Sequence, residues 1–149
     1  MLKLYPKNLE KDELINRLTH SPGIILGLIY MMLLIIKGLS QGPVEIATYL
    51  IYSLTYILVF ATSTIYHSQI CSKRKDLFKK LDHASIYLFM GGCYTPFILL
   101  NMQSEYKYEF LAFVWILSIM GVIYKFFSSY KNTLHSTALY LLFGFGCFL

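Results

Sequence analysis

Long apolar runs separated by short polar connections fill most of this sequence and restrict what the chain can fold into. A helix needs roughly 20 apolar residues to cross the hydrocarbon core of a bilayer. Inside that core, only helices or closed barrels satisfy their backbone polar groups. The sequence therefore predicts an all-α, polytopic transmembrane helical bundle. We expect its spans at about residues 22–39, 44–66, 83–100, 110–127 and 134–149.

The last of these runs is too short for a complete span. Residues 134–149 reach only about 24 Å at 1.5 Å per residue, whereas the hydrocarbon core is roughly 30 Å thick. We therefore expect about five helices in this chain, the last of them incomplete.

The composition supports a membrane protein and argues against a nucleic-acid partner. Only 14% of the residues are charged and 56% are hydrophobic, whereas an average soluble domain carries roughly 25% charged residues. The net charge of +5 comes from lysines and arginines in the connections, where such residues set membrane topology. The expected partners are therefore membrane lipids.

Lysine and arginine counts alternate between successive connections. Residues 1–21 hold four, the connection at 68–81 holds five, and the region after the fourth span holds two. The other two connections hold one each. Because cytoplasmic connections are enriched in these residues, we expect a multi-pass protein of the cell membrane. Its cytoplasmic N-terminal segment would be residues 1–21, followed by a single transmembrane domain at 22–149.

Local signals indicate where helices begin and end. Ser21 and Pro22 form a good start signal for the first span, because serine caps helices and proline fits the first turn. Residues 8–18 are compatible with either a short amphipathic surface helix or a solvated tail. Residues 68–81 are expected to form a basic loop. Pro96 should kink the third span, because proline removes a backbone hydrogen bond.

Ionisable and polar residues gather at one end of the second and third runs. Ser63 and His67 are four residues apart, so in a helix they share a face. Asp82 and His83 open the third run, and His135 begins the fifth run on the same side of the membrane. Polar groups at such positions are expensive to place and are therefore functional candidates.

Each of these residues also has a structural interpretation. A single histidine at a helix end, such as His67, is often only an interfacial hydrogen-bonding residue. Asp82 is equally compatible with an N-terminal carboxylate that the helix dipole favours. His83 points about 100° away from Asp82 around the helix, which favours a neighbouring polar residue over a second ligand. A Ser63–His67–Asp82 triad lacks the nucleophile elbow that usually accompanies one.

Three stretches together resemble the haemolysin III family. They are ELINRLTHSPGIILG at 13–27, STIYHS at 63–68 and LDHASIYLFMGGCYTPF at 81–97. The family is related to the progestin and adipoQ receptors and, more distantly, to alkaline ceramidases. It has seven helices, and the seventh carries an H-x-x-x-H motif that this sequence lacks. The chain resembles the first four and a half helices, so we expect an N-terminal fragment of the family fold.

The resemblance implies a zinc site. His67 would supply one ligand, the absent H-x-x-x-H motif two more, and water the fourth, which is the open geometry of catalytic zinc. Asp82 would position or deprotonate that water, and Ser63 would hydrogen-bond the water or a substrate oxygen. His135 is a weaker candidate for completing an alternative site in this short chain.

The resemblance leaves three functions open. The family is named for cytolysis, which implies a pore-forming membrane protein. The zinc site implies a hydrolase of lipid amides or esters, related to the ceramidase-like enzymes and expected to be incomplete in this chain. The third is a receptor or structural membrane protein without chemistry.

Overall fold

The computed structural model describes residues 7–69, 72–127 and 133–146. Within these ranges the chain is helical and has no strand, which confirms the all-α prediction. The elements in chain order are α1 (Lys7–Leu39), α2 (Pro43–His67), α3 (Ser72–Pro96), η1 (Phe97–Asn101), α4 (Lys107–Phe127) and α5 (Thr133–Gly146).

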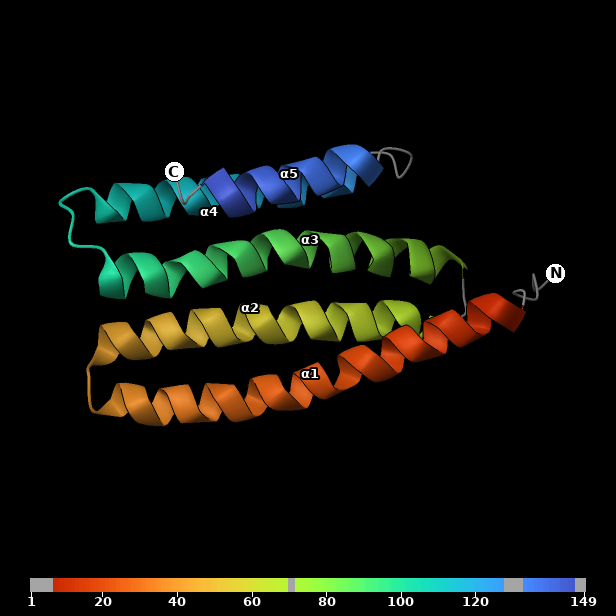
Figure 1. Cartoon of the computed structure of the whole chain (residues 1–149), viewed down its shortest axis with the longest axis horizontal. Helices are drawn as coiled ribbons and strands as arrows, with labels where there is room; N and C mark the ends of the chain where they lie inside the picture. The colour runs from red at the N-terminus through yellow and green to blue at the C-terminus, as the bar shows by residue number, and fades with distance from the viewer. Residues whose placement is uncertain (1–6, 70–71, 128–132, 147–149) are drawn as a thin grey trace.

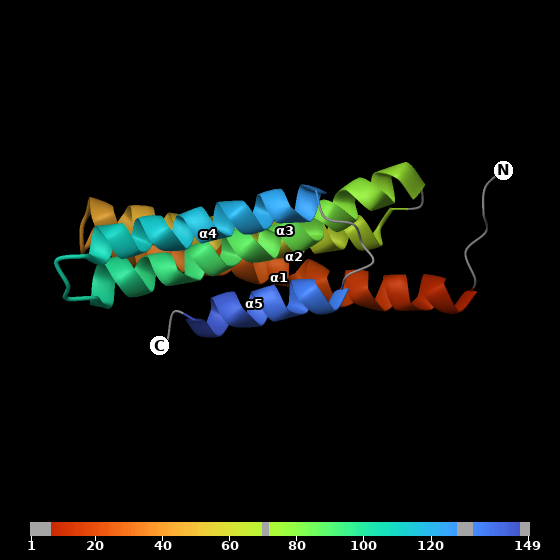
Figure 2. The same cartoon turned by 90° about the horizontal axis from the view of Figure 1, so that it is seen from above.

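The helices form an up-and-down bundle with α3 at its centre. Figure 1 shows α1, α2, α3 and α4 side by side in chain order, each running opposite to the one before it. Figure 2 shows that α5, which overlaps α4 in the first view, lies apart from the layer of the other helices. Since α3 packs against α2, α4 and α5, it joins the pair α1 and α2 on one side to α4 and α5 on the other.

Four of the helices are long and apolar enough to cross a membrane. These candidate spans are Lys11–Leu39, Pro43–His67, Arg74–Asn101 and Lys107–Phe127. Large apolar side chains cover their outer faces, and Met32 and Met120 are more than half exposed. Such an exterior is stable only in lipid, because exposed apolar surface is unfavourable in water. The protein is therefore a multi-pass membrane protein.

The first helix is longer than the sequence signals predict. α1 contains 33 residues and continues through Pro22, where we expected a span to begin. One proline removes a single backbone hydrogen bond, and the residues before it, rich in Lys, Glu, Leu and Arg, are good helix formers. At about 1.5 Å per residue α1 is roughly 50 Å long, so its polar N-terminal part extends beyond the hydrocarbon core. Figure 1 shows this part reaching past the end of α2.

The third helix also begins earlier than expected. α3 starts at Ser72, inside the stretch that we predicted to be a basic loop. The prediction was wrong because charge marks a connection without excluding a helix, and lysine, arginine and leucine all favour helix. Pro96 ends the α-helical pattern of α3, and the chain continues as the π-helical turn η1. The early start places Asp82 well inside α3 rather than at its N-terminus.

Small and hydroxyl-bearing residues let the central helices approach closely. Thr62 of α2 and Ser85 of α3 are buried, and their hydroxyl oxygens lie 2.9 Å apart. Gly92 of α3 faces Thr55 of α2 so closely that a Cβ at Gly92 would overlap the threonine side chain. Interfaces of this kind are typical of membrane helices, where small residues allow backbone contact.

We predict that Gly92→Val lowers the stability of the bundle by about 1–3 kcal/mol, because overpacking forces α2 and α3 apart. Thermal unfolding of the protein in detergent measures the effect. Gly144→Ala is the control, since a Cβ at Gly144 meets only Met90, at the ordinary distance of 3.8 Å. Equal melting temperatures for the two variants would contradict close packing at Gly92.

Candidate functional site

The predicted polar residues meet where α2 ends. Ser63 lies in the last turns of α2 and is only 4% exposed. Its side chain lies close enough to the carboxylate of Asp82 on α3 to interact with it. His67, His20 and His83 are close enough to Asp82 to interact with it electrostatically. The structure thus places Ser63, His67 and Asp82 in one neighbourhood.

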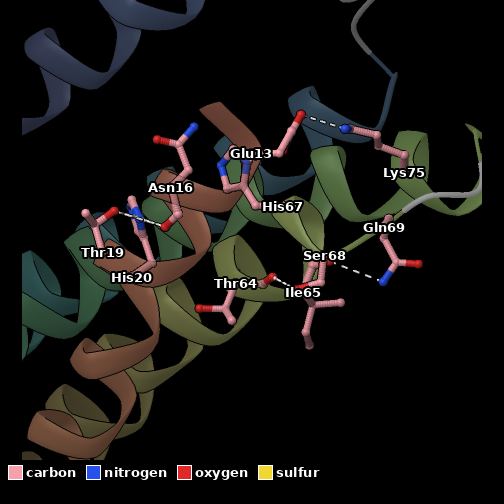
Figure 3. A network of polar contacts seen from close by, with 10 residues as sticks. All are labelled: Glu13, Asn16, Thr19, His20, Thr64, Ile65, His67, Ser68, Gln69 and Lys75. Carbon is pink, nitrogen blue, oxygen red and sulfur yellow. Dashed lines mark hydrogen bonds and ion pairs between the residues drawn. The ribbon is translucent and has the colours of Figure 1, made fainter. Parts of the chain in front are cut away.

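A carboxylate from α1 links this end of α2 to α3. The Oε2 atom of Glu13 accepts a hydrogen bond from Nδ1 of His67 at 2.6 Å. The Oε1 atom of Glu13 accepts one from Nζ of Lys75, also at 2.6 Å. Figure 3 shows Glu13 between the two residues. One side chain therefore joins three helices.

The three side chains of this bridge are largely withdrawn from solvent. Those of His67, Glu13 and Lys75 are 14%, 19% and 11% exposed, respectively. A charge that leaves water must be paired and hydrogen-bonded, because isolated burial costs several kcal/mol. Glu13 uses both of its oxygens for this, and Lys75 also lies 5.6 Å from the centre of the Tyr66 ring. The negative charge of Glu13 therefore lies beside the positive charge of Lys75, and each carboxylate oxygen has a hydrogen-bond donor.

A second histidine of α1 lies beside His67. The Nδ1 atom of His20 donates a hydrogen bond to the carbonyl of Asn16 at 2.8 Å. The His20 ring lies 6.2 Å from the His67 ring and 5.9 Å from the Phe60 ring, measured between ring centres. In both histidines Nδ1 is engaged, so Nε2 is the nitrogen that remains for another partner.

Glu13, His20 and Lys75 were not predicted from the sequence as site residues. A signal was present, since Glu13, Asn16 and His20 follow the i, i+3, i+7 spacing of one helix face. It was missed because Ser21 and Pro22 suggested a helix boundary there. Lys75 carried no comparable signal, since it is one of several lysines in a charged run.

The other two candidate histidines are placed differently. The backbone carbonyl of His83 accepts a hydrogen bond from the hydroxyl of Tyr140 at 2.9 Å, so this turn of α3 also contacts α5. His135 lies in α5, but its side chain is outside the part of the chain that the structure describes. The role of His135 therefore stays a prediction.

His67 has the arrangement of a metal ligand, but the described residues do not form a complete metal site. Metal-binding histidines usually donate their second ring N–H to a carboxylate, which fixes the ring, and Glu13 accepts that bond here. However, in the described ranges no three His, Cys, Asp or Glu side chains lie close enough together to hold a metal ion. His67 and Glu13 therefore fit one zinc ligand and the carboxylate that orients it, but the described residues do not supply the remaining ligands.

Comparison with known proteins identifies relatives that match most of the chain. Residues 9–149 match the family described as "Haemolysin-III related". A hemolysin-3 homolog of Bacillus subtilis is 33% identical over 135 residues, which cover 90% of this chain and 63% of that protein. Hemolysin-3 of Bacillus cereus is 34% identical over 135 residues, covering 90% and 62%. The chain thus spans about three fifths of the length of these curated relatives. No solved structure gives a significant match.

We predict that Glu13→Gln destabilises the protein by about 1–3 kcal/mol, because it leaves Lys75 with a weaker partner and breaks the charge match of the bridge. Thermal unfolding in detergent measures this. Asp12→Asn is the matched control, since it removes one carboxylate from the exposed neighbouring position. If both variants melt alike, the bridge contributes nothing specific to stability.

Proposed function

Because this chain belongs to the haemolysin-III related family, we propose that it is a haemolysin-like protein of the cell membrane with cytolytic, pore-forming activity. Family membership over nearly the whole sequence is the observation that carries this proposal. The curated relatives are named for haemolysis, and the apolar exterior of the spans suits a protein that acts within a bilayer. The excess of lysine and arginine at one end favours a cytoplasmic N-terminus.

The packing of the bundle favours a pore between chains over a channel inside one chain. Several buried hydroxyls in the described spans bond to carbonyls of their own helix, one turn earlier. Thr48 donates to Val44, Ser53 to Tyr49 and Ser118 to Val114. Hydroxyls engaged in this way do not line a water-filled path. We therefore expect several copies to act together in the membrane.

We predict that purified protein releases a trapped dye from lipid vesicles, and that the initial rate rises more steeply than linearly with the protein-to-lipid ratio. A joint action of several chains gives this dependence. Fluorescence dequenching measures the rate, with protein-free detergent as the control. His67→Ala should release dye as the unmodified protein does, since the proposed cytolysis does not involve the polar cluster of Ser63, His67 and Asp82. No release, or complete loss of release in His67→Ala, would contradict the proposal.

A second candidate function is zinc-dependent hydrolysis of lipid amides or esters. The closeness of Ser63 and Asp82, beside a histidine that a carboxylate orients, is the observation that favours it. His67 would bind the metal through Nε2, and zinc would supply a Lewis acid and a water of lowered pKa. Asp82 would accept a proton, and Ser63 would donate a hydrogen bond to a substrate oxygen. The missing ligands would come from residues beyond those described or from another chain.

Metal analysis tests this second candidate. Protein purified without added chelator should contain about one zinc per chain, and His67→Ala should lose it, because His67 is the proposed ligand. His83→Ala is the matched control and should keep the metal. Inductively coupled plasma mass spectrometry measures the content. Equal zinc in all three proteins, or none in any, would contradict a metal site at His67.

A further inference from the structure

An apolar groove lies on the other side of α3, away from the polar cluster. It has a volume of about 390 Å³ and is formed by α3, α4 and α5. Leu117 and Met120 of α4 line one wall, and Leu139 and Leu142 of α5 line the other. Met120 and Leu142 are 59% and 69% exposed, so the groove opens toward the surrounding lipid. This volume lies in the range of ordinary small-molecule sites.

The inner wall of the groove carries a hydroxyl that lacks a partner. Tyr87 of α3 lines the groove and is only 3% exposed. Its OH group has no hydrogen-bond partner among the described residues. The ring is fixed from two sides, by the Tyr140 ring at 4.7 Å and by the backbone of Gly121, where a Cβ would collide with it. A buried hydroxyl without a partner is unfavourable, so Tyr87 points to a ligand with a hydrogen-bond acceptor.

Positive charge gathers at one end of the same groove. Lys125 follows the groove residue Tyr124, and its Nζ lies 5.7 Å from the centre of the Tyr140 ring. Lys79 of α3 is close enough to Lys125 for the two charges to interact. Lys80 donates a hydrogen bond to the carbonyl of Phe126 at 3.0 Å. Positively charged side chains from α3 and α4 thus lie where α4 ends.

The spacing of these features matches one kind of molecule. Gly121 is level with Tyr87, and Lys125 lies four residues further along α4, or about 6 Å along the helix axis. A phospholipid has an apolar chain, an ester carbonyl and a phosphate in the same order, with the carbonyl a few bonds from the phosphate. Basic pockets between membrane helices are known to bind anionic headgroups.

We propose that the groove between α4 and α5 binds an anionic phospholipid of the surrounding membrane. One acyl chain lies along the apolar walls, an ester carbonyl accepts the hydrogen bond of Tyr87, and the phosphate lies beside Lys125 and Lys79. The groove is not lined by Ser63, His67 or Asp82, and the proposal depends on neither cytolysis nor hydrolysis. It gives α5 a lipid partner on the side that faces the groove.

Native mass spectrometry of the purified protein tests the proposal, with phosphatidylglycerol and phosphatidylcholine of the same acyl chains as probes. We expect one phosphatidylglycerol to be retained at detergent concentrations that strip phosphatidylcholine. Lys125→Gln should weaken retention about fivefold, whereas Lys107→Gln at the other end of α4 should not. Leu142→Trp should abolish retention by filling the groove, whereas Leu141→Trp, at the adjacent exposed position, should not. Both leucines are exposed, so neither change disturbs the core.

Three results would overturn the proposal. The first is equal retention of the two lipids by the unmodified protein. The second is an equal effect of the groove variants and their matched controls. The third is a dimer without bound lipid whose formation Leu142→Trp prevents, since the groove would then bind a second copy of the chain. Tyr87→Phe separates the two parts of the site, because it should weaken retention without changing the preference for the anionic headgroup.

Discussion

A carboxylate that is withdrawn from water needs charged or hydrogen-bonding partners, and Glu13 finds them on two neighbouring helices. Its two oxygens lie 2.6 Å from His67 of α2 and 2.6 Å from Lys75 of α3. Burying any one of the three side chains without the others would be unfavourable in free energy. The long N-terminal part of α1 and the early start of α3 therefore depend on each other, since both are needed to bring Glu13 and Lys75 together.

This bridge sets the geometry of the neighbouring polar cluster. His67 is held through Nδ1, which leaves Nε2 for a further ligand, and Ser63 on the same face of α2 lies near Asp82. The hydroxyl pair of Thr62 and Ser85 fixes α2 against α3 within one turn of these two residues. The cluster is thus positioned by rigid helices rather than by loops, as a preorganised site requires.

The sequence was sufficient for the class of fold because lipid restricts the choices so strongly. Long apolar runs must be helices, and the structure confirms a helical membrane bundle. Helix limits were less predictable, since a proline and a basic run are compatible with both a boundary and a continuous helix. Both Pro22 and the stretch after residue 72 are helical. Ser63, His67 and Asp82 stood out because they interrupt apolar surroundings, and their roles in catalysis or metal binding stay predictions.

The residues that pair across helices at this site could not be predicted from the local sequence pattern. Glu13 and His67 are 54 residues apart, and Glu13 and Lys75 are 62 apart. Periodicity assigns a residue to a face of its own helix, but it does not say which residue of another helix it meets. That pairing depends on how close the helices approach, which positions such as Gly92 control through the absence of a side chain.

A double-mutant cycle between Glu13 and Lys75 tests the central claim most directly. The free energy of unfolding would be measured in detergent for the unmodified protein, Glu13→Gln, Lys75→Gln and the double variant. Residues in direct contact give coupling energies of about 0.5–3 kcal/mol, and we expect more than about 1 kcal/mol for this pair. Additive effects, with coupling near zero, would contradict a bridge in which Glu13 holds α1 to the junction of α2 and α3.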